Sequence, residues 1–81
     1  MDQQTLSSRI GFCIRKQRLA LGLSQVEFAE RCGFYQTYLS RVERGQANPT
    51  INALEVVANA LGLTFFELIV KAEQGSNSDE S

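Results

Sequence analysis

Residues 24–45, with the sequence SQVEFAERCGFYQTYLSRVERG, decide how this chain folds. Ser24 is a good helix N-cap, and Glu27 three residues later completes a capping box, so a helix begins here. Gly33 stands where the chain needs a positive φ, which a residue without Cβ adopts at no steric cost. A second helix follows over about residues 36–44. The stretch therefore predicts two short helices joined by a tight turn.

The second of these helices has one apolar face and one polar face. Leu39 and Val42 point inward at helical spacing. The outer face carries side chains that suit base edges and phosphates, namely Gln36, Thr37, Tyr38, Ser40, Arg41 and Arg44. Two helices joined by a short turn are the arrangement that lays its second member in the DNA major groove. The pattern favours a helix-turn-helix that binds double-stranded DNA.

Outside this stretch, hydrophobic periodicity predicts three more helices, over about residues 7–21, 51–61 and 65–73. In the first and fourth helices, the residues expected to face the core are Ile10, Ile14, Leu21, Ile51, Leu54, Val57, Ala58 and Leu61. Together with the central pair, these segments predict an all-α fold of five helices.

Local signals mark where the later helices begin. Pro49 keeps the residue before it out of the helical region, which separates the third helix from the fourth. Thr50 is suited to cap the fourth helix. Thr64 and Glu67 form a second capping box, which opens the fifth helix.

The length and composition fit one small domain. The chain has 81 residues, of which 43% are hydrophobic and 21% charged, as in a soluble globular protein. We expect residues 1–73 to form the helical domain. Residues 74–81 are small, polar and acidic, and we expect a disordered acidic tail there.

Several classes of protein are not expected. No apolar run approaches the roughly 20 residues of a membrane span, and the N-terminus lacks the apolar core of a secretory signal. We therefore expect a cytoplasmic protein without a membrane partner. Cys13 and Cys32 lie within helical patterns and are expected to be buried, free thiols. With no His and only two thiols, a metal site is not expected. No cofactor motif or catalytic cluster is present, so we expect neither an enzyme nor a small-molecule ligand.

A formal net charge of −1 is unusual for a DNA-binding protein, but the charges of this chain are unevenly distributed. Between residues 9 and 46, seven basic residues stand against three acidic ones. From residue 47 onward, Lys71 stands alone against five acidic residues. A polyanion would attract the first part and repel the second, which would orient the molecule on DNA.

More apolar side chains are present than one small core accommodates. If Phe65 and Leu68 face the core, Phe66 and Ile69 lie on another face of the same helix, and Val56 falls outside the inward stripe of its own helix. Such a patch indicates a partner surface, and we expect a homodimer interface there. Alternatively, some of these side chains fold back onto the first helix near Phe12.

The stretch from Ile10 to Leu68 resembles the Xre/Cro-type helix-turn-helix family. That family includes lambdoid phage repressors, Cro proteins, antitoxins and restriction–modification controller proteins. The residues that carry the resemblance are Arg18-xxx-Gly22-Leu23-Ser24-Gln25, Ala29-xxx-Gly33, Leu39-xxx-Glu43-x-Gly45, Pro49-Thr50 and Ala58-xx-Leu61-Gly62. Within the family, the short length and the run from Thr37 to Arg44 are most similar to controller proteins.

The resemblance implies a five-helix, lambda-repressor-like domain that binds paired half-sites as a homodimer. By position, the residues implied to contact base edges are Gln36, Thr37, Ser40 and Arg41. Those implied to contact the sugar–phosphate backbone are Gln25, Tyr38, Arg44, Gln46 and Asn48. Arg18 and Glu43 match an ion pair that belongs to the scaffold. Tyr35 departs from the family pattern, because tyrosine cannot cap a helix as Asp, Ser or Thr does.

Two functions remain open on this evidence. The first is a homodimeric transcription regulator, a repressor or an activator, which binds inverted repeats in DNA. Activation would require a contact with RNA polymerase, for which Glu27 and Glu30 on the second helix are candidates. The alternative is an antitoxin or anti-repressor that acts mainly by masking a protein partner through Phe66 and Ile69.

Overall fold

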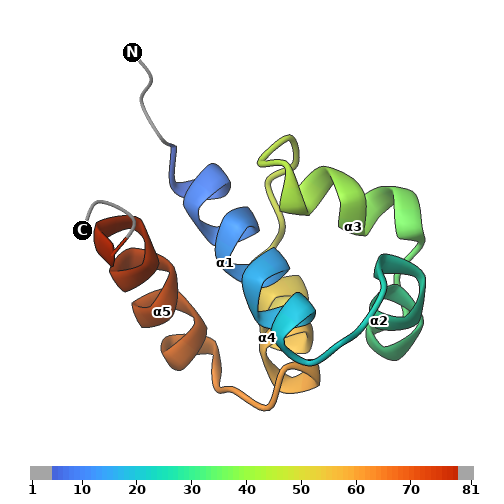
Figure 1. Ribbon diagram of the computed structural model, residues 1–81. Coiled ribbons are helices and arrows are strands. Elements are labelled where there is room, and N and C mark those ends of the chain that lie inside the picture. The colour runs from blue at the N-terminus through green and yellow to red at the C-terminus, as the bar shows by residue number, and fades with distance from the viewer. Residues whose placement is uncertain (1–4, 79–81) are drawn as a thin grey trace.

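The computed structural model describes residues 5–78, with side chains up to residue 74 (Figure 1). In this part of the chain all regular secondary structure is helical, as the sequence predicts. The five helices are α1 (Leu6–Ala20), α2 (Gln25–Cys32), α3 (Gln36–Glu43), α4 (Ile51–Ala60) and α5 (Phe65–Ser78).

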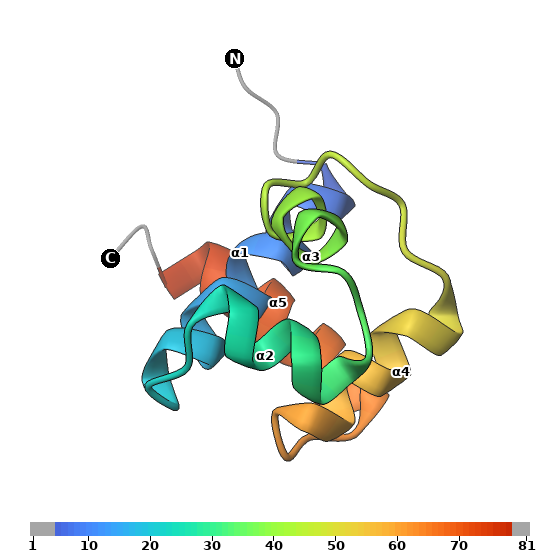
Figure 2. The same ribbon diagram turned by 90° about the vertical axis from the view of Figure 1, so that its right-hand side faces the viewer.

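The helices pack around α1. This helix packs against α5 on one side and α3 on the other, while α2 packs against α3 and α4, and α4 also packs against α5. In Figure 1, α5 lies at one edge of the molecule and α3 at the opposite edge, and in the perpendicular view α2 and α3 lie in front with α5 behind them (Figure 2). The helix-turn-helix therefore forms one end of the domain, far from α5.

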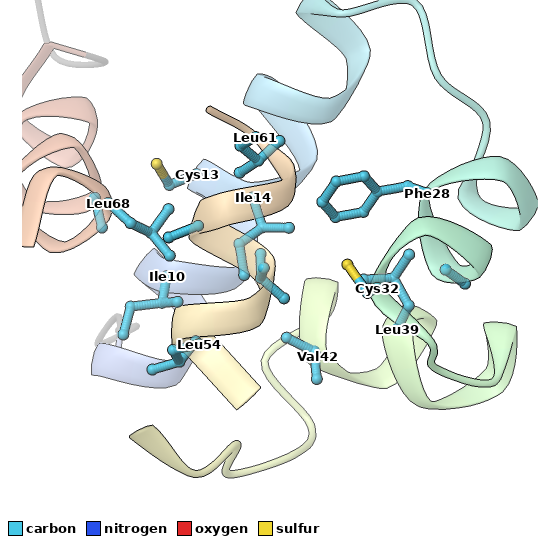
Figure 3. Packing of buried hydrophobic residues seen from close by; sticks show 14 residues of the cluster. Ile10, Cys13, Ile14, Phe28, Cys32, Leu39, Val42, Leu54, Leu61 and Leu68 are labelled. Carbon is cyan, nitrogen blue, oxygen red and sulfur yellow. The ribbon is translucent and has the colours of Figure 1, made fainter. Parts of the chain in front are cut away.

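One hydrophobic core draws side chains from all five helices (Figure 3). Ile14, Phe28, Leu39 and Leu68 are fully buried and come from four different helices. Burying one such side chain stabilises a fold by about 1.5–3 kcal/mol. The core thus holds α3 in place, because its own side chains Leu39 and Val42 are buried there while its outer face stays exposed.

α1 and α3 approach each other unusually closely at Gly11. A Cβ built on Gly11 would lie 2.6 Å from the carbonyl oxygen of Glu43, and closer still to that of Val42. No side chain fits there, so glycine lets the last turn of α3 rest directly on α1. This contact sets how far α3 projects from the body of the domain.

Most predicted helix starts are confirmed by hydrogen bonds. The Ser24 hydroxyl accepts from the Glu27 amide, and the Glu27 carboxylate accepts from the Ser24 amide, which completes the capping box. Thr64 and Glu67 form the same reciprocal pair at α5. Thr50 caps α4 by accepting from the amide of residue 53. α1 begins slightly earlier than expected because Thr5 caps it.

Two predicted core residues lie on the surface instead. Leu21 is 53% exposed, and the prediction that it faces the core is wrong. It is the C-cap of α1, and the inward position one turn earlier is taken by Arg18. Ile51 is 67% exposed, so its inward assignment is also wrong. It is the first residue of α4, whose buried stripe begins at Leu54.

The end of α5 also differs from the expectation. The helix continues to Ser78, over residues where a disordered tail was expected. Residues 79–81, which complete that predicted tail, lie outside the described residues.

No single described helix is long and apolar enough to cross a membrane. Helices α4 and α5 reach that length and composition only as a pair bent by 86°.

The two cysteines, Cys13 and Cys32, are buried and free, as predicted. Burial raises the pKa of the Cys32 thiol to about 11, and it also raises the pKa of Cys13.

Candidate DNA interface

The outer face of α3 presents its polar side chains to solvent. Gln36, Thr37 and Arg41 are exposed, and Ser40 is half-buried. Tyr38 is also half-buried, because its ring packs edge-on against Phe34 at a centroid distance of 5.1 Å. The structure thus brings the four predicted base-reading residues onto one exposed helix.

The turn before α3 gives this helix its direction. Gly33 adopts the left-handed conformation with φ of 75°. The amide of Phe34 then donates to the carbonyl of Ala29 at 2.9 Å, which ends α2 and turns the chain. Tyr35 is the N-cap of α3 and makes no side-chain capping hydrogen bond, as its chemistry predicts. Its side chain is 84% exposed at the start of α3.

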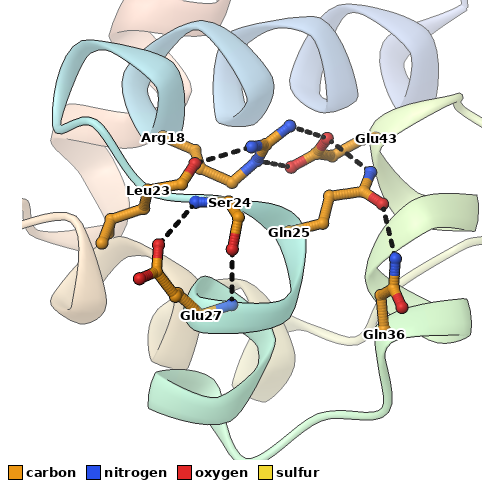
Figure 4. A network of polar contacts seen from close by, with 7 residues as sticks. All are labelled: Arg18, Leu23, Ser24, Gln25, Glu27, Gln36 and Glu43. Carbon is orange, nitrogen blue, oxygen red and sulfur yellow. Dashed lines mark hydrogen bonds and ion pairs between the residues drawn. The ribbon is translucent and has the colours of Figure 1, made fainter.

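A buried ion pair ties α1 to the last residue of α3 (Figure 4). Arg18 donates from Nε to Oε2 of Glu43 at 2.7 Å, and from Nη2 to Oε1 at 3.0 Å. A third bond runs from Arg18 Nη1 to the carbonyl of Leu23 at 2.8 Å, so the guanidinium also holds the segment that leads into α2. The two side chains are only 7% and 2% exposed. Paired in this way, they belong to the scaffold.

The ion pair is also linked to the start of α3 through Gln25. The Gln25 amide donates to Oε1 of Glu43 at 3.0 Å, and its carbonyl accepts from the Gln36 amide at 3.3 Å (Figure 4). The first residue of α2 and the first residue of α3 are therefore connected. Sequence reasoning missed this link, because the two glutamines are far apart in the chain and no spacing rule relates them.

The segment after α3 is held by two arginines. Arg44 donates to the Ser40 hydroxyl at 2.8 Å and to Oε1 of Gln46 at 3.3 Å. Arg41 donates to the backbone carbonyl of Gln46 at 3.1 Å. These contacts cluster the predicted base-contacting and phosphate-contacting groups at the C-terminal end of α3.

Asn48 lies apart from that cluster, where the loop meets the first turn of α1. Its Oδ1 accepts from the Ser7 hydroxyl at 3.0 Å. The bond leaves the amide nitrogen as the polar group that Asn48 presents outward.

Two of the predicted dimer residues, Phe66 and Ile69, belong to α5, which lies at the opposite edge of the domain from α3 (Figure 1), and the third, Val56, belongs to α4. Phe66 is 75% exposed and Val56 40% exposed, whereas Ile69 is half-buried and packs against the core. Phe66 borders a groove of about 390 Å³ together with Leu63 and Val70, and Val56 does not line it. Val70, 52% exposed, was missed by sequence reasoning although it follows Phe66 by one helical turn.

The helix-turn-helix family model HTH_3 matches residues 14–68. The chain is 39% identical over 74 residues to the uncharacterised HTH-type transcriptional regulator y4dJ of Sinorhizobium fredii, which covers 91% of this chain and 92% of that relative.

Among solved structures, the clp gene regulator ClgR from Corynebacterium glutamicum superposes with a TM-score of 0.85 at 27% identity, covering 90% of this chain and 94% of that one. The restriction–modification controller protein C.Esp1396I, solved as a tetramer with its natural 35 base-pair operator, gives a TM-score of 0.74 at 34% identity, covering 86% of this chain and 96% of that one.

Proposed function

Because this chain belongs to the helix-turn-helix family of transcription regulators, we propose that it is a cytoplasmic homodimer that binds inverted repeats in double-stranded DNA. One observation carries the proposal. A short helix with an exposed polar face is fixed by a buried ion pair and a direct backbone contact with α1. Such preorganisation lets base edges be distinguished without first ordering the helix.

Within this function, α3 enters the major groove. Gln36 suits adenine N6 and N7, Arg41 suits guanine O6 and N7, and the methyl group of Thr37 suits the thymine methyl. Each good bidentate pair contributes roughly 1–3 kcal/mol of discrimination. Ser40 lies on the same face, and its hydroxyl can donate a hydrogen bond to a base edge or accept one from it.

The backbone contacts are supplied around α3. Gln25 stands at the N-terminus of α2, where free amides favour a phosphate oxygen. Tyr38, Arg44, Gln46 and Asn48 are the further candidates for phosphate contacts. Since Gln25 is hydrogen-bonded to Gln36, a phosphate held by Gln25 would also restrict the rotamer of a base-reading side chain.

The homodimer would use the face that bears Val56, Phe66 and Ile69, extended by Val70. Phe66 and Val70 are 75% and 52% exposed and border the same groove, and a contiguous exposed apolar patch indicates a partner surface. Because α5 lies at the opposite edge of the domain from α3 (Figure 1), dimerisation through α5 would leave both copies of α3 free for two half-sites about one helical turn apart.

Within the family, the assignment we favour is a restriction–modification controller protein. The likeness to C.Esp1396I, solved as a tetramer on its operator, supports it. Whether the protein represses or activates depends on a contact with RNA polymerase, for which the exposed Glu27 and Glu30 are the candidates.

The experiment that tests the function is selection of bound duplexes from a randomised DNA pool. Salt at about 150 mM suppresses binding that depends on phosphates alone. An enriched inverted repeat is the expected result, and its spacing gives the half-site geometry. Absence of any enriched sequence would contradict the proposal.

The exposure of Phe66 also favours one other function, masking of a protein partner by an antitoxin or anti-repressor. The two functions differ in what the purified protein binds. A stoichiometric heterologous protein that co-purifies, together with no sequence enrichment in the DNA selection, would favour masking. A homodimer with an enriched operator would exclude masking as the main task.

A further inference from the structure

A polar groove of about 460 Å³ lies where α1, α2 and α3 meet. Its lining residues are Phe12, Arg15, Gln25, Ser40, Glu43 and Arg44. Three of them, Gln25, Ser40 and Arg44, already belong to the proposed DNA surface. The groove therefore brings α1 to the edge of that surface, although no residue of α1 was assigned a DNA contact.

The charge of the groove is positive despite the presence of Glu43. That carboxylate accepts two hydrogen bonds from Arg18 and one from Gln25. Its negative charge is therefore neutralised by the Arg18 guanidinium, which does not line the groove. The uncompensated charges are those of Arg15 and Arg44. An anion that enters the groove meets two guanidinium groups and the Ser40 hydroxyl.

Arg15 differs from Arg44 in having no use within the described part of the fold. Its side chain is exposed, and no hydrogen bond or ion pair joins it to another described residue. Arg44, in contrast, donates to Ser40 and Gln46. An unpaired guanidinium that shares a groove with three proposed DNA-contacting groups has the chemistry for a bidentate phosphate contact.

We propose that this groove binds a phosphate of the DNA backbone and that Arg15 of α1 contacts that phosphate. The inference rests on the proposed function and extends the DNA surface from the helix-turn-helix to the preceding helix. A strand that follows the groove passes between the N-terminus of α2 and the C-terminal half of α3. The phosphate at that point is then held from α1 as well.

The test compares salt dependence for the full chain and two arginine variants on the selected operator. The logarithm of the binding constant falls with the logarithm of salt concentration by about 0.9 for each phosphate contact. Arg15→Ala is expected to reduce that slope by about one contact and to weaken binding about tenfold at about 150 mM salt. The loss should be equal on operators with altered bases, because a phosphate contact carries no sequence information.

Arg31→Ala is the matched control, since it removes the same charge from an exposed position on α2 beside Glu27. It should leave the slope unchanged. Arg15→Lys keeps the charge and should preserve the slope while losing part of the affinity, because a lysine cannot form the bidentate contact. Equal slopes for Arg15→Ala, Arg31→Ala and the unaltered chain would overturn the inference.

A second measurement locates the phosphate. Operators are made with one backbone phosphate at a time replaced by an uncharged methylphosphonate. At one position the replacement should weaken the unaltered chain more than it weakens Arg15→Ala, since the variant has already lost its part of the contact with that phosphate. If replacements weaken both proteins equally at every position, Arg15 makes no phosphate contact. If the unaltered chain selects no operator at all, it is the proposed function that fails, and the inference fails with it.

Discussion

At the scale of single residues, the polar side chains near α3 divide into those that hold the helix and those that its surface offers to DNA. Arg18 and Glu43 are nearly inaccessible and satisfy each other. Arg41 and Arg44, two residues before Glu43 and one residue after it, are exposed to solvent. Burial thus separates charges that serve the fold from charges that are free to serve recognition.

Removing one partner of the buried pair should strongly destabilise the domain. Glu43→Ala leaves the Arg18 guanidinium buried without a counter-charge, which costs about 3–5 kcal/mol. Urea unfolding followed by circular dichroism measures the change. Glu30→Ala, which removes an exposed carboxylate from α2, should change stability by less than about 0.5 kcal/mol. Replacing both partners with Arg18→Met and Glu43→Leu should recover much of the loss. If Glu43→Ala changed the free energy of unfolding as little as Glu30→Ala does, the buried ion pair would not have the stabilising role described.

The two exposed arginines at the end of α3 should behave differently on a panel of base variants. Arg41→Ala should relax the preference at one base position, because a base contact carries about 1–3 kcal/mol of discrimination. Arg44→Ala should weaken binding to every sequence and reduce the salt slope by about one. Titrations on each duplex at several salt concentrations provide both readouts. Indistinguishable profiles for the two variants would remove this division of roles.

At the scale of the elements, the placement of α3 on α1 depends on a position with no side chain. Gly11→Ala puts a methyl group against the carbonyl oxygens of Val42 and Glu43. We expect a destabilisation of about 1–3 kcal/mol from this overpacking. At an unobstructed helix position the same change would stabilise by roughly 0.5–1 kcal/mol.

The same variant should also lose DNA affinity, since α3 must shift outward to accommodate the methyl group. Unfolding curves and operator titrations on one preparation separate the two effects. Ala20→Gly exchanges the same two residue types at the exposed end of α1, away from the close contact with α3, and should leave operator affinity intact. A stabilised Gly11→Ala protein with full affinity would show that the close approach is unimportant.

The helices were largely predictable because their signals are local. Ser24 with Glu27, and Thr64 with Glu67, identify helix starts within four residues of sequence, and the structure has both. Helix ends were less predictable. Leu21 fits the apolar period of α1, yet it lies at the C-cap, where no other described helix covers it, and its side chain is exposed.

The polar outer face of α3 was predictable from the sequence, but the contacts that connect it to the other helices were not. Chain position indicated which residues of α3 face outward. The bond between Gln25 and Gln36, and the groove that adds Arg15, depend on how three helices pack. Contacts between residues on different helices form only in the folded molecule, so the spacing of residues in the sequence does not predict them. The homodimer remains a prediction, since it depends on a second copy.

At the scale of the whole molecule, the two ends of the domain have different chemistry. The α3 end is polar and basic, and the α5 side exposes Phe66 and Val70.

Phe66→Glu should weaken the dimer by at least about 2 kcal/mol, roughly a 30-fold rise in the dissociation constant. Sedimentation equilibrium measures it, and Ile51→Glu, at another exposed apolar position, is the control. Unchanged association of the Phe66 variant would place the interface elsewhere.

The opening of α3 also gives the molecule an intrinsic optical probe. The chain contains no tryptophan and only two tyrosines, Tyr35 and Tyr38, and both lie at the start of α3. All of its tyrosine fluorescence therefore originates at the surface proposed to meet DNA. Stacked bases or a nearby backbone would change that emission directly, whereas association through α5 would leave it almost untouched. The unlabelled protein can thus report separately on the two surfaces that it is proposed to use.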